Sequence, residues 1–357
     1  MSGMVKDSNK AILTDDQLKK YESAAAKGRQ WLLGRLQPDG LFNARNLNLR
    51  CYLRSPLALL MTGAPRAAYK LLDTLGKKYL CDDGDFRTSA ETKYGADRFN
   101  VRGEKNHYLY GNGWATISAH ANGRFDMSYR AMAYLLRYQD PWTGGFFTQR
   151  GALGKPEERQ DLASTASACY ALLFCGKIWE AAKAADFLLR LYELQSESDH
   201  IYLSRTREGG LVKHFSQEDA FFYVVDRRQT KQAYWMLGYA SALLAKVYLA
   251  SGERKYLEGA VKYFDFLASC QPDVVSFFGF WKQAWAAAVL SSILKEEKYT
   301  CCASSLLDRI ASGQQEEGYW AWSRELGVGP EYEDWLVDLS SEMIVWLCEL
   351  PRILLSP

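Results

Sequence analysis

Two carboxylates near the C-terminus have the spacing that proton transfer requires. Asp338 and Glu342 are four residues apart in a stretch that we expect to be helical, so their side chains share one face. Two carboxylates close together in an apolar wall raise the pKa of one of them, which then keeps a proton to donate. The alternative is that Asp338 caps the helix and Glu342 pairs with an arginine of a neighbouring helix.

His107 is a second candidate for proton transfer, and it is one of four histidines in the chain. Histidine titrates near neutral pH, so at a cavity mouth it can act as an acid or a base. It stands beside Tyr108, expected to be a wall residue, and near Tyr110, which could also move a proton. We expect His107 at the start of a helix, where the other interpretation is a hydrogen bond to a loop carbonyl.

A third group of polar residues closes the long segment 195–230. Asp226 stands two residues before Arg228, so its carboxylate is either a catalytic group held ionised by the guanidinium or a helix cap with its ion pair. The run Phe221-Phe222-Tyr223 just before it is expected to form a lid or cavity wall, or to pack on the protein's own surface.

Side chains that could surround a substrate follow the same segments and are mostly aromatic. They are Arg50, Tyr108, Asn112, Trp114, Tyr223, Arg228, Gln232, Trp235, Phe278, Trp281, Gln283, Trp322 and Trp335. Aromatic faces stabilise cations, stack on sugar rings or fold a hydrophobic substrate. Their alternative role is to join neighbouring helices in the core.

A repeat in the sequence indicates which helices position these groups. Six apolar, helix-like stretches each end at a polar turn. The clearest turns are residues 37–42 (Gln-Pro-Asp-Gly-Leu-Phe) and 315–320 (Gln-Glu-Glu-Gly-Tyr-Trp), with a weaker copy at 81–86. Looser copies begin at Gln139, Gln195 and Gln271. Self-similarity of this kind predicts a repetitive architecture.

The stretches around the turns alternate between charged, amphipathic helices and helices rich in small and aromatic residues. We predict twelve helices, at about 15–36, 49–61, 66–80, 107–122, 125–138, 160–175, 178–194, 230–250, 254–270, 279–295, 298–312 and 337–355. Helices that are apolar nearly all round are buried, and short breaks make neighbours antiparallel. The prediction is an all-α (α/α)6 barrel, or toroid, of six helical hairpins in one domain, 15–357, after a flexible N-terminal tail, 1–14.

In such a barrel the starts of the inner helices and the turns before them surround one mouth. The inner-helix N-termini point free N–H groups into it, which favours electron-rich groups. The segments 82–110 and 195–230 are much longer than the other connections, and long loops inside a compact domain are usually functional. We therefore expect functional residues to collect in these two segments.

Two motifs resemble known families. The turn pattern Gln-x-x-Gly-x-aromatic resembles the QW repeat of terpenoid cyclases and protein prenyltransferases. The segment Tyr110-Gly111-Asn112-Gly113-Trp114 is similar to one in unsaturated glucuronyl hydrolases. Both resemblances imply an (α/α)6 barrel, and they imply different reactions. The Asp-x-Asp-Asp acid of class II terpene cyclases is missing, because residues 82–85 read Asp-Asp-Gly-Asp in a repeat turn.

Composition excludes several other classes of function. The formal charge of +2 over 357 residues predicts no nucleic-acid partner. Eight cysteines without a Cys-x-x-Cys pair suit reduced thiols, and the N-terminus resembles no secretion signal, so we expect a cytoplasmic protein. No apolar run approaches the roughly 20 residues of a membrane span. Nucleotide and metal motifs are missing, so we expect no cofactor and no metal; the oligomeric state is left open.

Three functions remain open. The first is a cofactor-independent cyclase or isomerase of a hydrophobic, terpenoid- or polyketide-like molecule, which would fold in the aromatic cavity. His107, Tyr110, Asp338 or Glu342 would then move a proton, and Arg228 or Gln283 would polarise a carbonyl. The second is a carbohydrate hydrolase or lyase with tryptophan platforms and two carboxylates. The third is a non-catalytic ligand-binding toroid.

Overall fold

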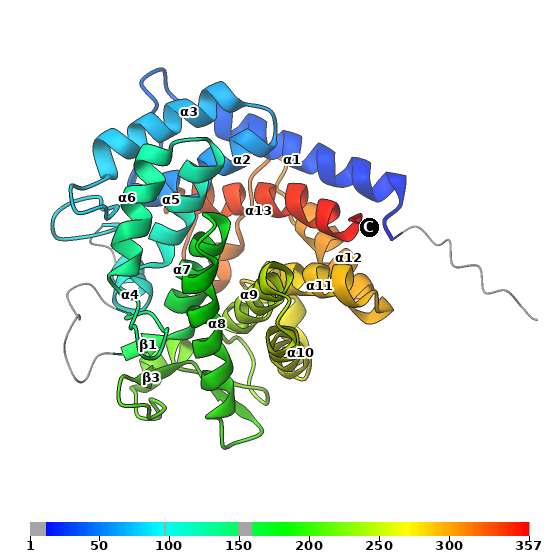
Figure 1. Cartoon of the computed structure of the whole chain (residues 1–357). Helices are drawn as coiled ribbons and strands as arrows, with labels where there is room; N and C mark the ends of the chain where they lie inside the picture. The colour runs from blue at the N-terminus through cyan, green and yellow to red at the C-terminus, as the bar shows by residue number, and fades with distance from the viewer. Residues whose placement is uncertain (1–11, 96–97, 149–158, 357) are drawn as a thin grey trace, which may run out of the picture.

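The structure is a computed structural model that describes residues 12–95, 98–148 and 159–356 (Figure 1). Most of the expected tail, residues 1–11, lies outside the described residues. Six helices take the outer positions: α1 (Asp15–Arg35), α3 (Pro65–Thr74), α6 (Phe125–Leu136), α8 (Ile178–Glu193), α10 (Arg254–Ala268) and α12 (Glu297–Ser312). Six take the inner positions: α2 (Ser55–Met61), α5 (Tyr110–Ala121), α7 (Leu162–Phe174), α9 (Tyr234–Ser251), α11 (Trp281–Leu294) and α13 (Glu333–Leu354).

The inner helices form a closed ring. Each contacts the next in the order α2, α5, α7, α9, α11, α13, and α13 returns to α2. Five outer helices pair with the inner helix that precedes them, and the sixth hairpin joins the two ends of the chain, because α1 packs on α13. In Figure 1, α3, α6 and α10 lie at the periphery, outside α2, α5 and α9. The predicted all-α (α/α)6 toroid is confirmed.

The composition of the inner helices explains why they lie inside. In α7 every residue from Leu162 to Leu172 is buried, so this helix has no face for water. Small residues allow close approach: a Cβ on Gly113 of α5 would lie 2.3 Å from Ser167 Oγ of α7. By contrast, α1 exposes one face and begins at Thr14 with a capping box to Gln17.

The two clearest polar turns share one geometry. In the first and last copies the amide of the leading glutamine donates to a carbonyl four residues later, Gln37 to Leu41 and Gln315 to Tyr319, both at 2.8 Å. Gly40 and Gly318 have φ values of +86° and +105°, which disfavour any side chain. Gly318 also sits against the Lys27 carbonyl of α1, 2.8 Å from where its Cβ would stand, so this turn helps to close the ring.

The long connections contain structure that the periodicity did not predict. An additional helix, α4 (Arg98–His107), lies in the long connection 82–110. His107 therefore ends α4 and does not begin the inner helix α5. Four short strands, β1 (Arg159–Asp161), β2 (His200–Tyr202), β3 (Ser204–Thr206) and β4 (Val224–Asp226), pair as β1 with β3 and β2 with β4, both antiparallel. Shorter turns of helix span Leu49–Tyr52, Leu75–Tyr79, Gln217–Phe222, Pro272–Val275 and Trp322–Leu326.

Two expected helix starts are corrected. The stretch 49–61 is broken, because the turn at Leu49–Tyr52 ends before α2 and leaves Arg54 at the N-cap position. The last helix begins at Glu333 and not at 337, so Asp338 lies inside α13 and cannot cap it. With these helix starts, the charged side chains of Arg54 and Asp338 both lie on the inner wall of the ring.

Candidate active site

A cavity of about 440 Å³ opens where the inner helices begin. Its walls come from α4, α13, the starts of α5, α9 and α11, and the segments before α2, α9 and α13. The lining residues are Arg50, Arg54, Tyr94, Arg102, His107, Tyr110, Glu218, Phe221, Phe222, Lys231, Trp235, Phe277, Phe278, Gly279, Trp281, Lys282, Glu325, Leu326, Val328, Trp335, Asp338, Leu339 and Glu342. The two long connections, as expected, both contribute.

Aromatic rings form much of the wall. Trp235 lies edge-on to both His107 and Tyr110, at centroid distances of 5.5 Å. Phe278 lies edge-on to Trp281 at 5.0 Å. Edge-to-face contacts of this kind lock ring orientations, so the wall is a preformed apolar surface.

Arg54 is the centre of the charged floor. Its Nη1 lies 2.5 Å from Asp338 Oδ1, and its Nη2 lies 3.7 Å from Glu342 Oε2. The same Nη2 donates a 3.0 Å hydrogen bond to the Tyr110 hydroxyl. Burial disfavours its charge, but the two carboxylates outweigh that effect and raise the pKa of Arg54. The guanidinium thus holds two acids and a phenol in one buried cluster.

The two carboxyl groups of α13 have opposite pKa shifts. Burial raises the pKa of Asp338, and the Glu342 charge adds to this, although Arg54 and Arg50 oppose it. Burial also disfavours ionised Glu342, but Arg54 and Lys282 outweigh it and lower the pKa of Glu342. A pair whose pKa values are pushed apart offers a protonated acid beside a carboxylate. The alternative stated for Glu342, an ion pair with a neighbouring arginine, is also found, since Arg54 Nη2 lies 3.7 Å from Glu342 Oε2; a role of the pair in proton transfer stays a prediction.

Lys282 is the buried counter-ion of Glu342. Its Nζ donates a 2.5 Å hydrogen bond to Glu342 Oε1, and its side chain is 1% exposed. The ammonium lies over the rings of Trp114, Tyr239 and Trp346 at 4.7, 4.8 and 4.5 Å. Burial lowers the pKa of Lys282 to about 8, and Glu342 partly offsets that shift. The aromatic cage below the cavity is therefore already occupied by a cation.

Arg50 extends the floor toward the mouth. Its guanidinium lies 4.1 Å from the Trp335 ring centroid and 4.6 Å from that of Tyr94. It also lies 3.7 Å from Asp338 Oδ2, the oxygen that Arg54 does not hold at close range. Each carboxyl oxygen of Asp338 therefore lies near an arginine, Oδ1 near Arg54 and Oδ2 near Arg50. Arg50 is rigidly stacked and presents a planar cation beside the apolar wall.

His107 lines the cavity, and its Nδ1 lies 3.9 Å from Asp161 Oδ1. Asp161 is fixed by the Ser164 amide and the Thr148 hydroxyl, each donating at 2.8 Å. Burial disfavours its charge, but His107 and Arg159 help to lower the pKa of Asp161. An imidazole beside a fixed carboxylate is an arrangement for accepting a proton.

Nine of the residues proposed from sequence line this cavity. They are Arg50, His107, Tyr110, Trp235, Phe278, Trp281, Trp335, Asp338 and Glu342. They come from five separate parts of the chain, which the closed ring brings together.

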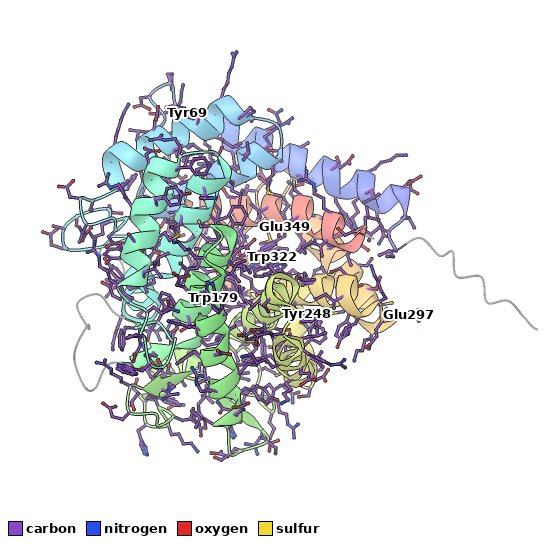
Figure 2. The ribbon with its side chains drawn as sticks, in the orientation of Figure 1. Tyr69, Trp179, Tyr248, Glu297, Trp322 and Glu349 are labelled. Carbon is purple, nitrogen blue, oxygen red and sulfur yellow. The ribbon has the colours of Figure 1, made fainter. Side chains whose placement is uncertain are left out.

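Others lie behind the wall. Tyr108 and Asn112 both donate to buried Asp85, at 2.5 and 2.9 Å, in a cluster that organises the second connection. Trp114 belongs to the Lys282 cage, and Gln283 is buried beside Gly238. Trp322 stacks on Trp281 with centroids 5.7 Å apart, and Figure 2 labels it near the middle of the ring, whereas Tyr69 stands at the outer edge. Tyr108, Asn112, Trp114, Gln283 and Trp322 are not among the described residues that line the cavity.

Residues 223–232, at the end of the long connection before α9, are placed differently from our expectation. The Asp226 carboxylate binds the Arg228 amide and side chain at 2.9 and 3.1 Å, and its Oδ2 lies 3.4 Å from His200 Nε2. Gln232 hydrogen-bonds the Asp226 backbone, and Tyr223 lies under Arg159 at 4.4 Å. Asp226 is in β4, well before α9, so it is not a helix cap. These four residues hold the connection together and are outside the described cavity lining.

Sequence reasoning missed Arg54 and Lys282. Each is a single charge in an apolar stretch, Leu53-Arg54-Ser55-Pro56 and Phe280-Trp281-Lys282-Gln283. A charge in a helix that is otherwise buried all round needs a buried partner, and that signal was available. The partners could not be named, because they lie on a helix that follows much later in the chain.

Comparisons with solved structures reproduce this fold. A D-mannose isomerase aligns with a TM-score of 0.62 and 15% identity over 95% of this chain and 99% of that chain. The type II terpene cyclase MstE from Scytonema, with geranylgeranyl dihydroxybenzoate, gives 0.56 and 14% over 96% and 100%. The GH76 α-mannanase BT2949 of Bacteroides thetaiotaomicron gives 0.57 and 12% over 94% and 97%.

Sequence comparison adds no family. No protein-family model and no curated protein matches the chain. Among the described residues, no group of three or more histidine, cysteine, aspartate or glutamate side chains is arranged to hold a metal, and no helix is both long and apolar enough to cross a bilayer. The structural likeness, at identities of 15% and below in these three cases, shows that the chain is an (α/α)6 toroid.

Proposed function

We propose that this protein is a cofactor-independent isomerase or cyclase of an apolar small molecule, with Asp338 as the general acid. The observation that carries the proposal is the raised pKa of Asp338 in a buried cluster that opens into an aromatic cavity. A carboxylic acid whose pKa is raised keeps its proton to higher pH than usual and can protonate a carbonyl, an epoxide or an alkene. A volume of about 440 Å³ suits a ligand of small-molecule size.

The neighbouring groups support this assignment of roles. Arg54 and the Tyr110 hydroxyl stand beside Asp338 and would hydrogen-bond the oxygen of a polarised carbonyl. His107, with Asp161 behind it, is contributed by α4 and would remove a proton from carbon. Protonation at one end of the substrate and deprotonation at the other is an isomerisation, or a cyclisation when a bond forms between the two steps.

A substrate can contact the aromatic rings that line the cavity, but not the rings that surround Lys282. Lys282 fills the space between Trp114, Tyr239 and Trp346, so these rings serve the protein's own cation. Trp235, Phe278 and Trp335 line the cavity itself and would hold the substrate in a folded shape. Positive charge that develops on the substrate would lie against these rings.

A carbohydrate-active enzyme is the second candidate. The D-mannose isomerase and the α-mannanase share the fold, and Trp235 and Trp335 could stack on sugar rings. A hydrolase needs two carboxyl groups that flank the scissile bond. Asp338 and Glu342 instead share one face of α13 and the same arginine, so they approach a ligand from one side. This favours proton transfer over glycoside hydrolysis.

Ligand binding followed by isotope incorporation tests the proposal. A panel of apolar carbonyl compounds and a matched panel of mono- and oligosaccharides are screened by quenching of tryptophan fluorescence. Hits are incubated in ²H₂O, and products are analysed by mass spectrometry. We expect apolar hits that gain deuterium with the wild type and not with Asp338→Asn. Asp186→Asn, on outer helix α8, is the matched control that should behave like the wild type.

Other outcomes separate the alternatives. Saccharide hits with turnover would replace the proposal with the carbohydrate-active enzyme. Binding of apolar compounds without any turnover or exchange would leave a ligand-binding toroid.

A further inference from the structure

Lys282 is a buried amine that the proton-transfer proposal does not use. Lys282 lines the cavity next to Glu342, the carboxylate with the lowered pKa, and its Nζ donates to Glu342 Oε1. A lysine that serves only as a counter-ion needs no route to a ligand. Because Lys282 and Glu342 both line the cavity, a ligand bound there would lie beside this pair.

The surroundings of Lys282 meet the requirements of imine chemistry. Imine formation needs a neutral amine, a base for its proton and a site that tolerates the resulting cation. Burial lowers the pKa of Lys282 to about 8, so roughly a quarter of it is neutral at pH 7.5, against about 0.1% of an ordinary lysine. Glu342 Oε1, 2.5 Å away, can take the proton. Trp114, Tyr239 and Trp346 already surround a cation at this point.

We infer that Lys282 captures an apolar aldehyde as a protonated imine. The ligand class follows from the wall above it, where Trp281, Phe278 and Leu339 would bind an alkyl or terpenoid chain. An iminium is a cation in the place of the ammonium, so the charge balance with Glu342 and Arg54 is unchanged.

The step is balanced without an oxidant or a cofactor. Glu342 takes one proton from the ammonium, and the neutral Nζ adds to the carbonyl carbon, whose oxygen receives a second proton from nitrogen. Glu342 then returns its proton to the hydroxyl group, which leaves as water. The net reaction converts the ammonium and the aldehyde to the iminium and one water. Hydrolysis reverses it.

Reductive trapping tests the inference on the intact protein. The protein is incubated with decanal and cyanoborohydride at pH 7.5, and tryptic peptides are quantified by mass spectrometry. Alkylation at Lys282 blocks cleavage there and joins residues 263–295 in one peptide. Lys255 and Lys298 are internal references, because their ion pairs raise their pKa values. We expect Lys282 to be labelled about tenfold or more above both references.

Three controls make the outcome decisive. Lys282→Arg keeps the cation for Glu342 and should lose the 263–295 adduct while surface labelling continues. Excess decanol, which cannot form an imine, should compete with labelling at Lys282 and not at Lys298. Glyceraldehyde at the same concentration should label the surface lysines alone. Labelling of Lys298 equal to or above Lys282, no effect of decanol, or preferential labelling of Lys282 by glyceraldehyde would each overturn the inference.

The inference shares its apolar carbonyl ligand with the proposed function but does not depend on proton transfer by Asp338. Asp338→Asn should therefore lose turnover and retain decanal trapping. Loss of trapping in the wild type with normal turnover would refute the imine and leave the proposed function standing.

Discussion

Arg54 and Asp338 lie 2.5 Å apart across the seam where the last inner helix meets the first. They are 284 residues apart in sequence, and both side chains are at least nine-tenths buried. The contact that helps to close the ring is thus also the centre of the candidate site. Folding of the two chain ends and assembly of the acid cluster are one event.

Replacing Asp338 by Asn should abolish turnover and weaken the fold. Asparagine cannot keep both contacts of the Asp338 carboxyl group with Arg54 and Arg50, and a buried donor left without its partner costs about 1–3 kcal/mol. Loss of a general acid lowers the rate by about 10² to 10⁴. Urea denaturation and turnover of an identified substrate measure the two effects. Glu258→Gln, which breaks the exposed pair with Arg254, is the control and should change stability by under about 0.5 kcal/mol. Equal stability of Asp338→Asn and wild type would refute the buried pair.

The rate should fall as pH rises through the raised pKa of Asp338. A general acid is active only while protonated, and burial keeps Asp338 protonated above the usual range for a carboxyl group. The folded-state pKa is above the unfolded one, so its stabilising contribution is present at low pH and is lost as pH rises through the folded value. A pH profile of kcat/KM checks this. A flat profile from the ordinary aspartate range to neutral pH would contradict it.

His107→Phe should remove the activity and slightly destabilise the protein. The imidazole Nδ1 lies 3.9 Å from the buried Asp161 carboxylate, which loses this neighbour in the variant, and such a loss costs about 1 kcal/mol. Phenylalanine would keep the edge-on contacts with Phe222 and Trp235. Thermal unfolding and turnover measure the two effects. His120→Phe is the control, since His120 is bonded to Ser128 at 3.1 Å and should be active and slightly destabilised. Undiminished turnover of His107→Phe would remove it from the mechanism.

The buried amine of Lys282 should make stability rise with pH above neutrality. Its folded-state pKa of about 8 is below the unfolded value, so the unfolded chain binds more protons between the two. The difference in unfolding free energy between wild type and Lys282→Arg should grow by about 2 kcal/mol in favour of the wild type from pH 7.5 to 9.5. Arginine does not titrate in this range, so the variant isolates the amine. A constant difference would show that Lys282 titrates normally.

Gly238→Ala should disturb the site through packing alone. A Cβ on Gly238 of α9 would lie 2.8 Å from the Gln283 amide nitrogen and the Lys282 carbonyl carbon of α11. Backbone atoms cannot move away at low cost, so we expect the free energy of unfolding, measured by urea denaturation, to fall by about 1–3 kcal/mol. Gly34→Ala on exposed α1 has nothing within 4 Å and should gain about 0.5–1 kcal/mol. Neutral behaviour of Gly238→Ala would mean that α9 and α11 are less closely packed.

The ring of helices was predictable because each helix follows a local pattern in the sequence. Charged and small-residue helices alternate, and glycine turns separate them, so the order of inner and outer helices follows from the chain. The Asp338 and Glu342 pair was predictable for the same reason, since four residues place both on one helix face. The broken first inner helix was not, because the turn at Leu49–Tyr52 is fixed by contacts with α13 and by Asn48.

The rest of the site depends on contacts between distant segments. Arg54 and Lys282 find their partners only after the ring closes, so neither could be assigned a partner in advance. Asp226 looked catalytic because it neighbours Arg228, but β4 pairs with β2 and turns that carboxylate toward His200. His107 was assigned to the wrong helix, because α4 contains few apolar residues and lies inside a long connection. The spacing of charged residues along the chain therefore identified candidate site residues, but it did not show where they lie in the fold.

The most direct test of the account is isotope transfer by Asp338. An apolar carbonyl compound selected by binding is converted in ²H₂O, and the product is analysed by mass spectrometry and deuterium NMR. We predict one deuterium at a new position with the wild type and no conversion with Asp338→Asn, whereas Asp186→Asn converts as the wild type does. Conversion by Asp338→Asn at the wild-type rate, with the same deuterium content, would contradict the account.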